Sequence, residues 1–143
     1  MRKTYIALGS NMGDRRANLQ QAVNRIDNEI GQVLQCSSIY EVPAVGFPGA
    51  IFLNACLVAE SEKTPKAILK ALQAIENEMG RKQATDGLYH DRPIDLDLIM
   101  ARERRHTACC CRHRPGRIWT LDLLSAVPRR RTCRGRIPRL SPP

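Results

Sequence analysis

The composition of this chain changes abruptly near residue 100, and this change limits what can fold as one domain. Residues 101–143 contain twelve arginines, two acids and no lysine, whereas residues 1–100 contain 11 basic and 12 acidic residues and are nearly neutral. Each ordered residue costs about 1–2 kcal/mol of backbone entropy, which only buried apolar area can offset. We therefore expect a folded domain over residues 1–100 and a largely disordered tail over 101–143.

Strand and helix patterns alternate along residues 1–100. Strands are predicted over 3–8, 32–41, 51–59 and 94–99, with Gly9 ending the first strand and Val42-Pro43 leaving the sheet. Asp14 and Thr64 are expected N-caps, and residues 82–91 are an expected exposed loop. The expected helix stripes are Leu19, Ala22, Val23, Ile26 and Ile30, then Ile68, Leu72, Ile75 and Met79.

This order, β-α-β-β-α-β, predicts an α+β protein: a ferredoxin-like sandwich with both helices on one face of an antiparallel sheet. Side chains alternate along a strand, so Asp95 and Asp97 should point away from the helices if Leu96 points toward them. The same alternation puts Phe52 and Asn54 on that opposite face. We expect these polar groups to converge on an uncovered surface.

Two carboxylates one strand period apart can hold hard cations. Asp95 and Asp97 would suit two Mg²⁺ ions that share phosphate oxygens of a substrate, although a solvated acidic strand face is the alternative. Arg81, before the expected loop, and Arg92, just ahead of the pair, favour a polyphosphate ligand. Asn54 and Phe52 favour a planar heterocycle, bound by hydrogen bonds and stacking. The turn at residues 9–11 could bind phosphate before a helix, but we favour a structural role for it.

Five ordered motifs carry a resemblance to a known family. They are residues 6–15 (IALGSNMGDR), residues 37–41 with Pro43, residues 52–55 (FLNA), Glu76 through Arg81, and residues 91–99 (DRPIDLDLI). Together they resemble the 6-hydroxymethyl-7,8-dihydropterin pyrophosphokinases over residues 3 to about 100.

The resemblance implies an ATP-dependent enzyme of folate biosynthesis, which transfers pyrophosphate from ATP to 6-hydroxymethyl-7,8-dihydropterin and leaves AMP. It implies that Asp95 and Asp97 hold two Mg²⁺ ions and act with Arg81 and Arg92 in catalysis. The implied pterin-binding and ATP-binding positions are Pro43, Val45, Phe52 and Asn54 for the pterin, and Gln73, Glu76, Arg81 and Arg92 for ATP.

The chain departs from the family pattern in two places. Residues 82–91 offer only Lys82 and His90 where many members have a further arginine. Beyond Ile99, the family's proline-histidine-proline segment and final strand are not recognisable, and an arginine-, cysteine- and proline-rich segment without lysine resembles a frameshifted translation. A zinc site would need paired Cys-x₂-Cys spacings, which that segment lacks.

The alternative functions are a small RNA-binding protein with a basic tail and a catalytically dead family member. The strands lack the aromatic motif with which such folds stack RNA bases, so we do not expect a nucleic-acid partner. No apolar run reaches the ~18 residues of a membrane span, and no export signal is recognisable. We expect a cytosolic monomer whose partners are ATP and the dihydropterin.

Overall fold

The computed structural model describes residues 1–81 and 90–103 of the 143-residue chain. The elements follow the order β1 (Arg2–Ser10), α1 (Arg15–Glu29), β2 (Gln32–Cys36), β3 (Tyr40–Val42), β4 (Phe52–Ser61), α2 (Pro65–Glu78) and β5 (Asp95–Glu103). The strands form one antiparallel sheet in the order β2-β4-β1-β5, with β3 also paired to β4. This order is that of the split β-α-β arrangement, which confirms the predicted α+β class.

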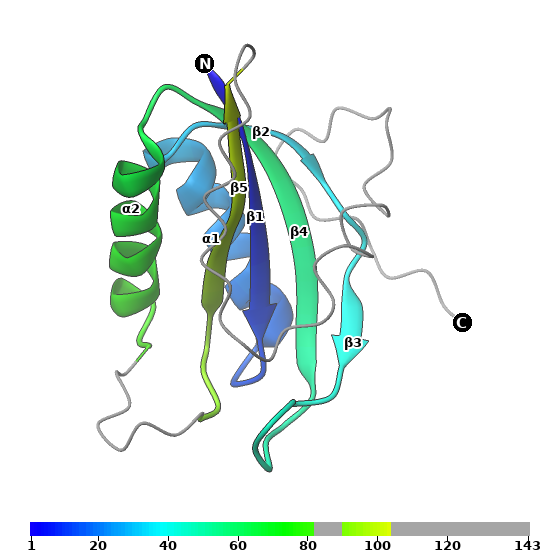
Figure 1. The fold of residues 1–143 in the computed structure, drawn as a ribbon. Coiled ribbons are helices and arrows are strands. Elements are labelled where there is room, and N and C mark those ends of the chain that lie inside the picture. Colours follow the sequence, from blue (N-terminus) through cyan, green and yellow to red (C-terminus); the bar gives the residue numbers. More distant parts are fainter. Residues whose placement is uncertain (82–89, 104–143) are drawn as a thin grey trace.

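Both helices lie on the same face of the sheet (Figure 1), and each begins at its predicted cap. The Asp14 carboxylate accepts a hydrogen bond from the Ala17 N–H at 3.0 Å, and the Thr64 hydroxyl accepts one from the Ala67 N–H at 3.3 Å. Such side chains replace the hydrogen-bond partners that the first turn of a helix lacks.

The core lies between the helices and the sheet and contains the predicted stripes. The helix residues of these stripes pack against every second residue of the strands. Those almost fully buried include Leu19, Ile26, Ile68 and Leu72. Burying one such side chain contributes about 1.5–3 kcal/mol. The sheet residues in this cluster include Leu53, Ala55, Leu57 and Ala59 of β4 and Leu96, Leu98 and Ala101 of β5. The predicted inward faces of both strands are therefore confirmed.

The predicted strand over 32–41 is wrong in one respect, because the chain forms two strands there. From Cys36 to Tyr40 it advances four residues, while the partner strand advances three, from Leu57 to Asn54. The extra residue forces a break in the ladder. At this break the Ser37 hydroxyl accepts a hydrogen bond from the Cys56 N–H at 2.9 Å, so a side chain takes the place of a main-chain partner.

Several strand ends also differ from the prediction. Gly9 does not end the first strand, since β1 continues through Ser10, and Val42 remains paired with Phe52. β5 begins at Asp95 and continues to Glu103, whose partner is Arg2. Residues 101–103 of the expected tail are thus part of the sheet. The expectations for residues 82–89 and 104–143 lie outside the described residues.

Candidate functional site

The sheet brings the predicted site residues together in one row across three strands. Asn54 of β4 pairs with Gly9 of β1, and Gly9 pairs on its other side with Asp95 of β5. Paired residues of an antiparallel ladder point to the same face. Asn54 and Asp95 therefore share the face opposite the helices, as the alternation in sequence predicted.

Glycine at position 9 makes this row possible. A Cβ atom there would lie 2.7 Å from Oδ1 of Asn54, closer than real Cβ contacts. Without that atom, the Asn54 amide occupies the space above β1 and is 2% exposed. The expectation that this face is uncovered is consequently wrong at Asn54.

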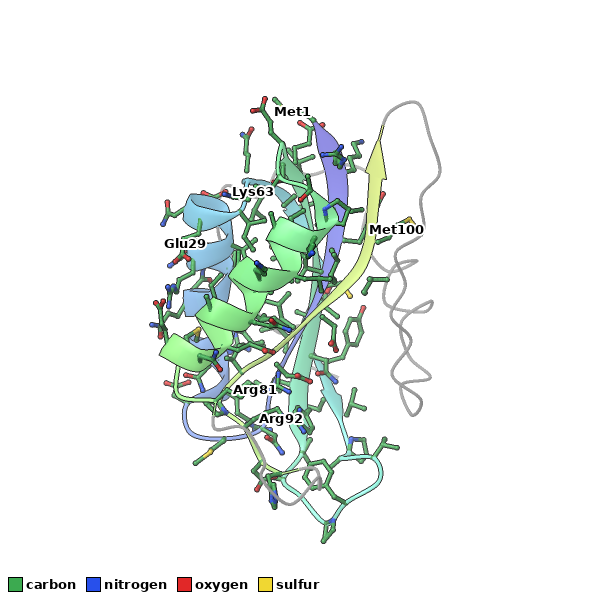
Figure 2. The ribbon with its side chains drawn as sticks, turned by 60° about the vertical axis from the view of Figure 1, so that its left-hand side comes forward. Met1, Glu29, Lys63, Arg81, Arg92 and Met100 are labelled. Atoms are coloured by element: carbon green, nitrogen blue, oxygen red, sulfur yellow. The ribbon has the colours of Figure 1, made fainter. Side chains whose placement is uncertain are left out.

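Asp95 is also buried, because two arginines cover it. Its Oδ1 accepts hydrogen bonds from Arg81 at 2.8 Å and from Arg92 at 3.4 Å. Figure 2 shows Arg81 and Arg92 at the same end of the sheet, where α2 and the residues before β5 approach each other. The side chain of Asp95 is 3% exposed, so this acid is not part of a solvated acidic face.

Glu76 fixes the position of Arg81. Glu76 is on the buried side of α2. Its carboxylate forms an ion pair with Arg81 and accepts a hydrogen bond from the Leu96 N–H at 2.6 Å. Burial raises the pKa of Glu76, while the Leu96 N–H and the Arg81 guanidinium act in the opposite direction. Gln73 lies one turn earlier on α2 and is exposed, so the structure does not bring it to this cluster.

Asp97 lies one strand period beyond Asp95 and is partly exposed. Its partner across the ladder is Ala7, so glycine and alanine stand opposite the two acids. Neither neighbour carries a side chain larger than a methyl group, so neither brings a polar group next to the carboxylates. Within residues 1–81 and 90–103, no cluster of three or more histidine, cysteine or acidic side chains is placed to hold a metal ion.

The predicted pterin positions lie at the other end of the row. Phe52 begins β4 and is partly buried, and its ring meets that of Phe47 edge to face, with centroids 6.5 Å apart. Pro43 and Val45 belong to the loop between β3 and β4 and are exposed. This loop, residues 43–51, is called the β3–β4 loop below.

Two residues near the site were not assigned roles from the sequence. Tyr40 pairs with Asn54, which places a half-exposed aromatic ring in the same row. Asn11 follows β1 and is 4% exposed, with hydrogen bonds to both Asp91 and Arg92. Alternation along 32–41 could have indicated Tyr40, had the extra residue in that strand been recognised. Nothing in the local sequence pattern pairs Asn11 with residues 80 positions away.

Together these features define an α+β domain in which an arginine–aspartate cluster and a group of polar and aromatic side chains, Asn54, Tyr40 and Phe52, lie on one sheet face. The family model of the 7,8-dihydro-6-hydroxymethylpterin-pyrophosphokinases matches residues 5–136. The chain belongs to this family, whose members are ATP-dependent pyrophosphokinases that transfer pyrophosphate to hydroxymethyldihydropterin in folate synthesis. The RNA-binding alternative is not favoured.

Similar curated proteins are described as pyrophosphokinases or as bifunctional proteins of folate synthesis. A 2-amino-4-hydroxy-6-hydroxymethyldihydropteridine pyrophosphokinase from Porphyromonas gingivalis is 44% identical over 98 residues, which are 67% of this chain and 67% of that protein. The corresponding Bacillus subtilis protein is 40% identical over 98 residues, 67% of this chain and 58% of that protein. The mitochondrial folate synthesis bifunctional protein of Pisum sativum is 41% identical over 99 residues, 68% of this chain but 19% of that protein.

A solved structure supports the fold alone. It is described as a crystal structure of HPPK-DHPS in complex with substrates, and it matches with a TM-score of 0.54 at 15% identity. The match covers 70% of this chain and 27% of that chain. Among the described residues, no helix combines the length and apolarity needed to cross a membrane.

Proposed function

We propose that this chain transfers the β,γ-pyrophosphoryl group of ATP to the hydroxymethyl oxygen of 6-hydroxymethyl-7,8-dihydropterin, with the phosphates at the arginine–aspartate cluster. The observation that supports this proposal is the row Asn54–Gly9–Asp95, which places a buried amide and a charged cluster on one face. We place the pterin pocket at the Asn54 end of this row. One ligand with a planar ring and one with phosphates would meet along this row.

The pterin half of the proposal uses Asn54, Phe52, Pro43 and Val45. A buried amide offers one acceptor and two donors to a heterocycle, and an aromatic ring at the mouth of the pocket offers a stacking surface. Phe52 is held by its edge-to-face contact with Phe47. The exposed Pro43 and Val45 would cover the ring from the β3–β4 loop.

The phosphate half uses Arg81, Arg92, Asp95 and Asp97. The donor set suits two Mg²⁺ ions, because Asp95 and Asp97 offer hard oxygen ligands one strand period apart and phosphates would complete the coordination. When bound, Mg²⁺ would neutralise the charge of the triphosphate. Arg81 and Arg92 both donate hydrogen bonds to Asp95, and their guanidinium groups would offer further donors to phosphate oxygens.

Catalysis then rests on positioning and charge. Phosphoryl transfer needs little covalent chemistry from the protein, since the reacting oxygen and phosphorus must mainly be held in line. Glu76 would keep Arg81 at the cluster, and Gln73 would contact the nucleotide from the exposed side of α2. We propose further that the pterin pyrophosphokinase-like domain, placed from the sequence at residues 1–100 and incomplete at its C-terminal end, holds this site, in a monomer located in the cytosol.

The test is the formation of products by the full 143-residue chain. With ATP, dihydropterin and Mg²⁺, we expect AMP and the pterin diphosphate in equal amounts, as resolved by ³¹P NMR and chromatography. Omitting Mg²⁺ should stop the reaction. Binding of pterin without AMP formation would instead identify a catalytically dead member of the family.

A further inference from the structure

Asn11 connects three segments that are far apart in the sequence. It follows β1, and its Nδ2 donates hydrogen bonds to Asp91 Oδ1 at 2.6 Å and to the Ala50 carbonyl at 3.1 Å. Its Oδ1 accepts a hydrogen bond from the Arg92 N–H at 2.8 Å. Both donors and the acceptor of this amide are therefore used.

Asp91 closes the arrangement from the other side. Its Oδ1 accepts a second hydrogen bond, from the Ala50 N–H at 3.2 Å. Gly49 permits this contact, because a Cβ atom there would lie 2.7 Å from the same oxygen. The Asn11–Asp91 pair thus holds Ala50, at the end of the β3–β4 loop, through both its N–H and its carbonyl.

The same pair also fixes the main chain of Arg92, whose guanidinium reaches Asp95. Besides the bond to Oδ1, the Arg92 carbonyl accepts a hydrogen bond from the Asn11 N–H at 3.2 Å. A displacement of the β3–β4 loop would therefore move Arg92 as well. One end of this connection is at the proposed pterin pocket and the other is at the proposed phosphate site.

We propose that Asn11 and Asp91 are positioning residues that couple occupancy of the pterin pocket to the placement of Arg92. The inference rests on the proposed function, since it assumes that the two ligands bind at the two ends of the row. Coupling between two sites is reciprocal, so each ligand should raise the affinity for the other by the same factor.

The test measures this factor by calorimetry on the full chain, with dihydropterin and a non-hydrolysable ATP analogue in the presence of Mg²⁺. Asn11→Asp keeps the size of the side chain, removes both donors and places a carboxylate against Asp91. For Asn11→Asp we expect the Kd of each ligand alone to stay within about threefold of the wild-type value. The coupling factor should fall toward one, and kcat should change by a larger factor than KM.

Two further variants make the test specific. Asp91→Ala removes the bonds from Asn11 and from the Ala50 N–H to Asp91 without adding a charge, while Asn11 still bonds to Ala50 and Arg92. It should lower the coupling factor in part, and it keeps the test available if Asn11→Asp does not fold. Asn18→Asp is the matched control, because within the described residues the Asn18 amide donates hydrogen bonds to Ser10 and Met12, in the turn before α1, and to neither Asp91 nor Ala50. Its coupling factor should equal that of wild type.

Two results would overturn the inference. Both ligands could bind to wild type without cooperativity, or the cooperativity could persist undiminished in Asn11→Asp and Asp91→Ala. Either result would leave the proposed function intact. Failure of wild type to bind either ligand would overturn the proposed function, and the coupling with it.

Discussion

Gly9 and Asn54 are paired so closely that a Cβ atom on Gly9 would lie 2.7 Å from the Asn54 amide oxygen. Gly9→Ala must therefore displace the amide from the proposed pterin pocket. We expect the Kd of the dihydropterin to rise about tenfold or more, equivalent to about 1.4 kcal/mol. The Kd of the ATP analogue should change less than twofold. Equal pterin affinity in Gly9→Ala and wild type would contradict the role of Asn54.

Asp97→Asn tests the proposed metal ligands with little change in shape. We choose Asp97 because it is more exposed than Asp95, which also anchors two arginines. We expect Mg²⁺-dependent transfer to fall about 10²-fold or more, the magnitude typical of losing one preorganised charged group. Pterin affinity should remain, as measured by calorimetry. Asp14→Asn is the control, since asparagine also caps a helix, and its turnover should match wild type.

Arg92 should contribute mainly to the rate. The positive charge of Arg92 should stabilise the negative charge that moves between phosphate oxygens during transfer. We therefore expect Arg92→Ala to lower kcat/KM by an amount equivalent to about 2–4 kcal/mol of transition-state stabilisation, most of it through kcat. Lysine cannot reproduce the planar fork of arginine, and Arg92→Lys should recover only part of the loss. Steady-state kinetics separates the two parameters. An unchanged kcat with a raised KM would limit Arg92 to substrate binding.

Glu76 should make stability depend on pH. Its pKa in the folded protein is raised by burial, so the folded state holds this proton more tightly than the unfolded state. The stabilisation from this group is complete below the unfolded pKa of about 4.3 and is lost as pH rises through the folded value. Glu76→Gln lacks this titration. The free energy of unfolding of wild type minus that of Glu76→Gln should therefore fall as pH rises from 4, measured by urea denaturation. A difference that rises with pH would show that the ion pair with Arg81 outweighs burial.

The sequence predicted those parts of the fold that depend on local pattern. Both helices follow from apolar spacing and from caps such as Asp14, and the faces of β4 and β5 follow from alternation. The break at Ser37 was missed, because an extra residue between paired strands is visible only relative to the partner strand. The strand from Asp95 was expected to end at Ile99, but its pairing with β1 extends it to Glu103.

Within the site, the sequence indicated which residues share a face but not how they contact one another. Burial of Asn54 depends on the glycine of the neighbouring strand, and burial of Asp95 depends on Arg81 from the end of α2 as well as on Arg92 just before β5. The hydrogen bonds of Asn11 join residues brought together by the turn after β1 and the approach to β5. Long-range contacts of this kind leave no periodic signal in the chain.

The most direct test of the account is a single reaction of the full chain with ATP and 6-hydroxymethyl-7,8-dihydropterin, with and without Mg²⁺. Product formation would be followed by ³¹P NMR, and Asp97→Asn would be measured beside wild type. We predict equal amounts of AMP and pterin diphosphate from wild type, only with Mg²⁺ present, and a rate at least about 10²-fold lower from Asp97→Asn. Release of ADP, or equal rates in the two proteins, would contradict pyrophosphoryl transfer at this site.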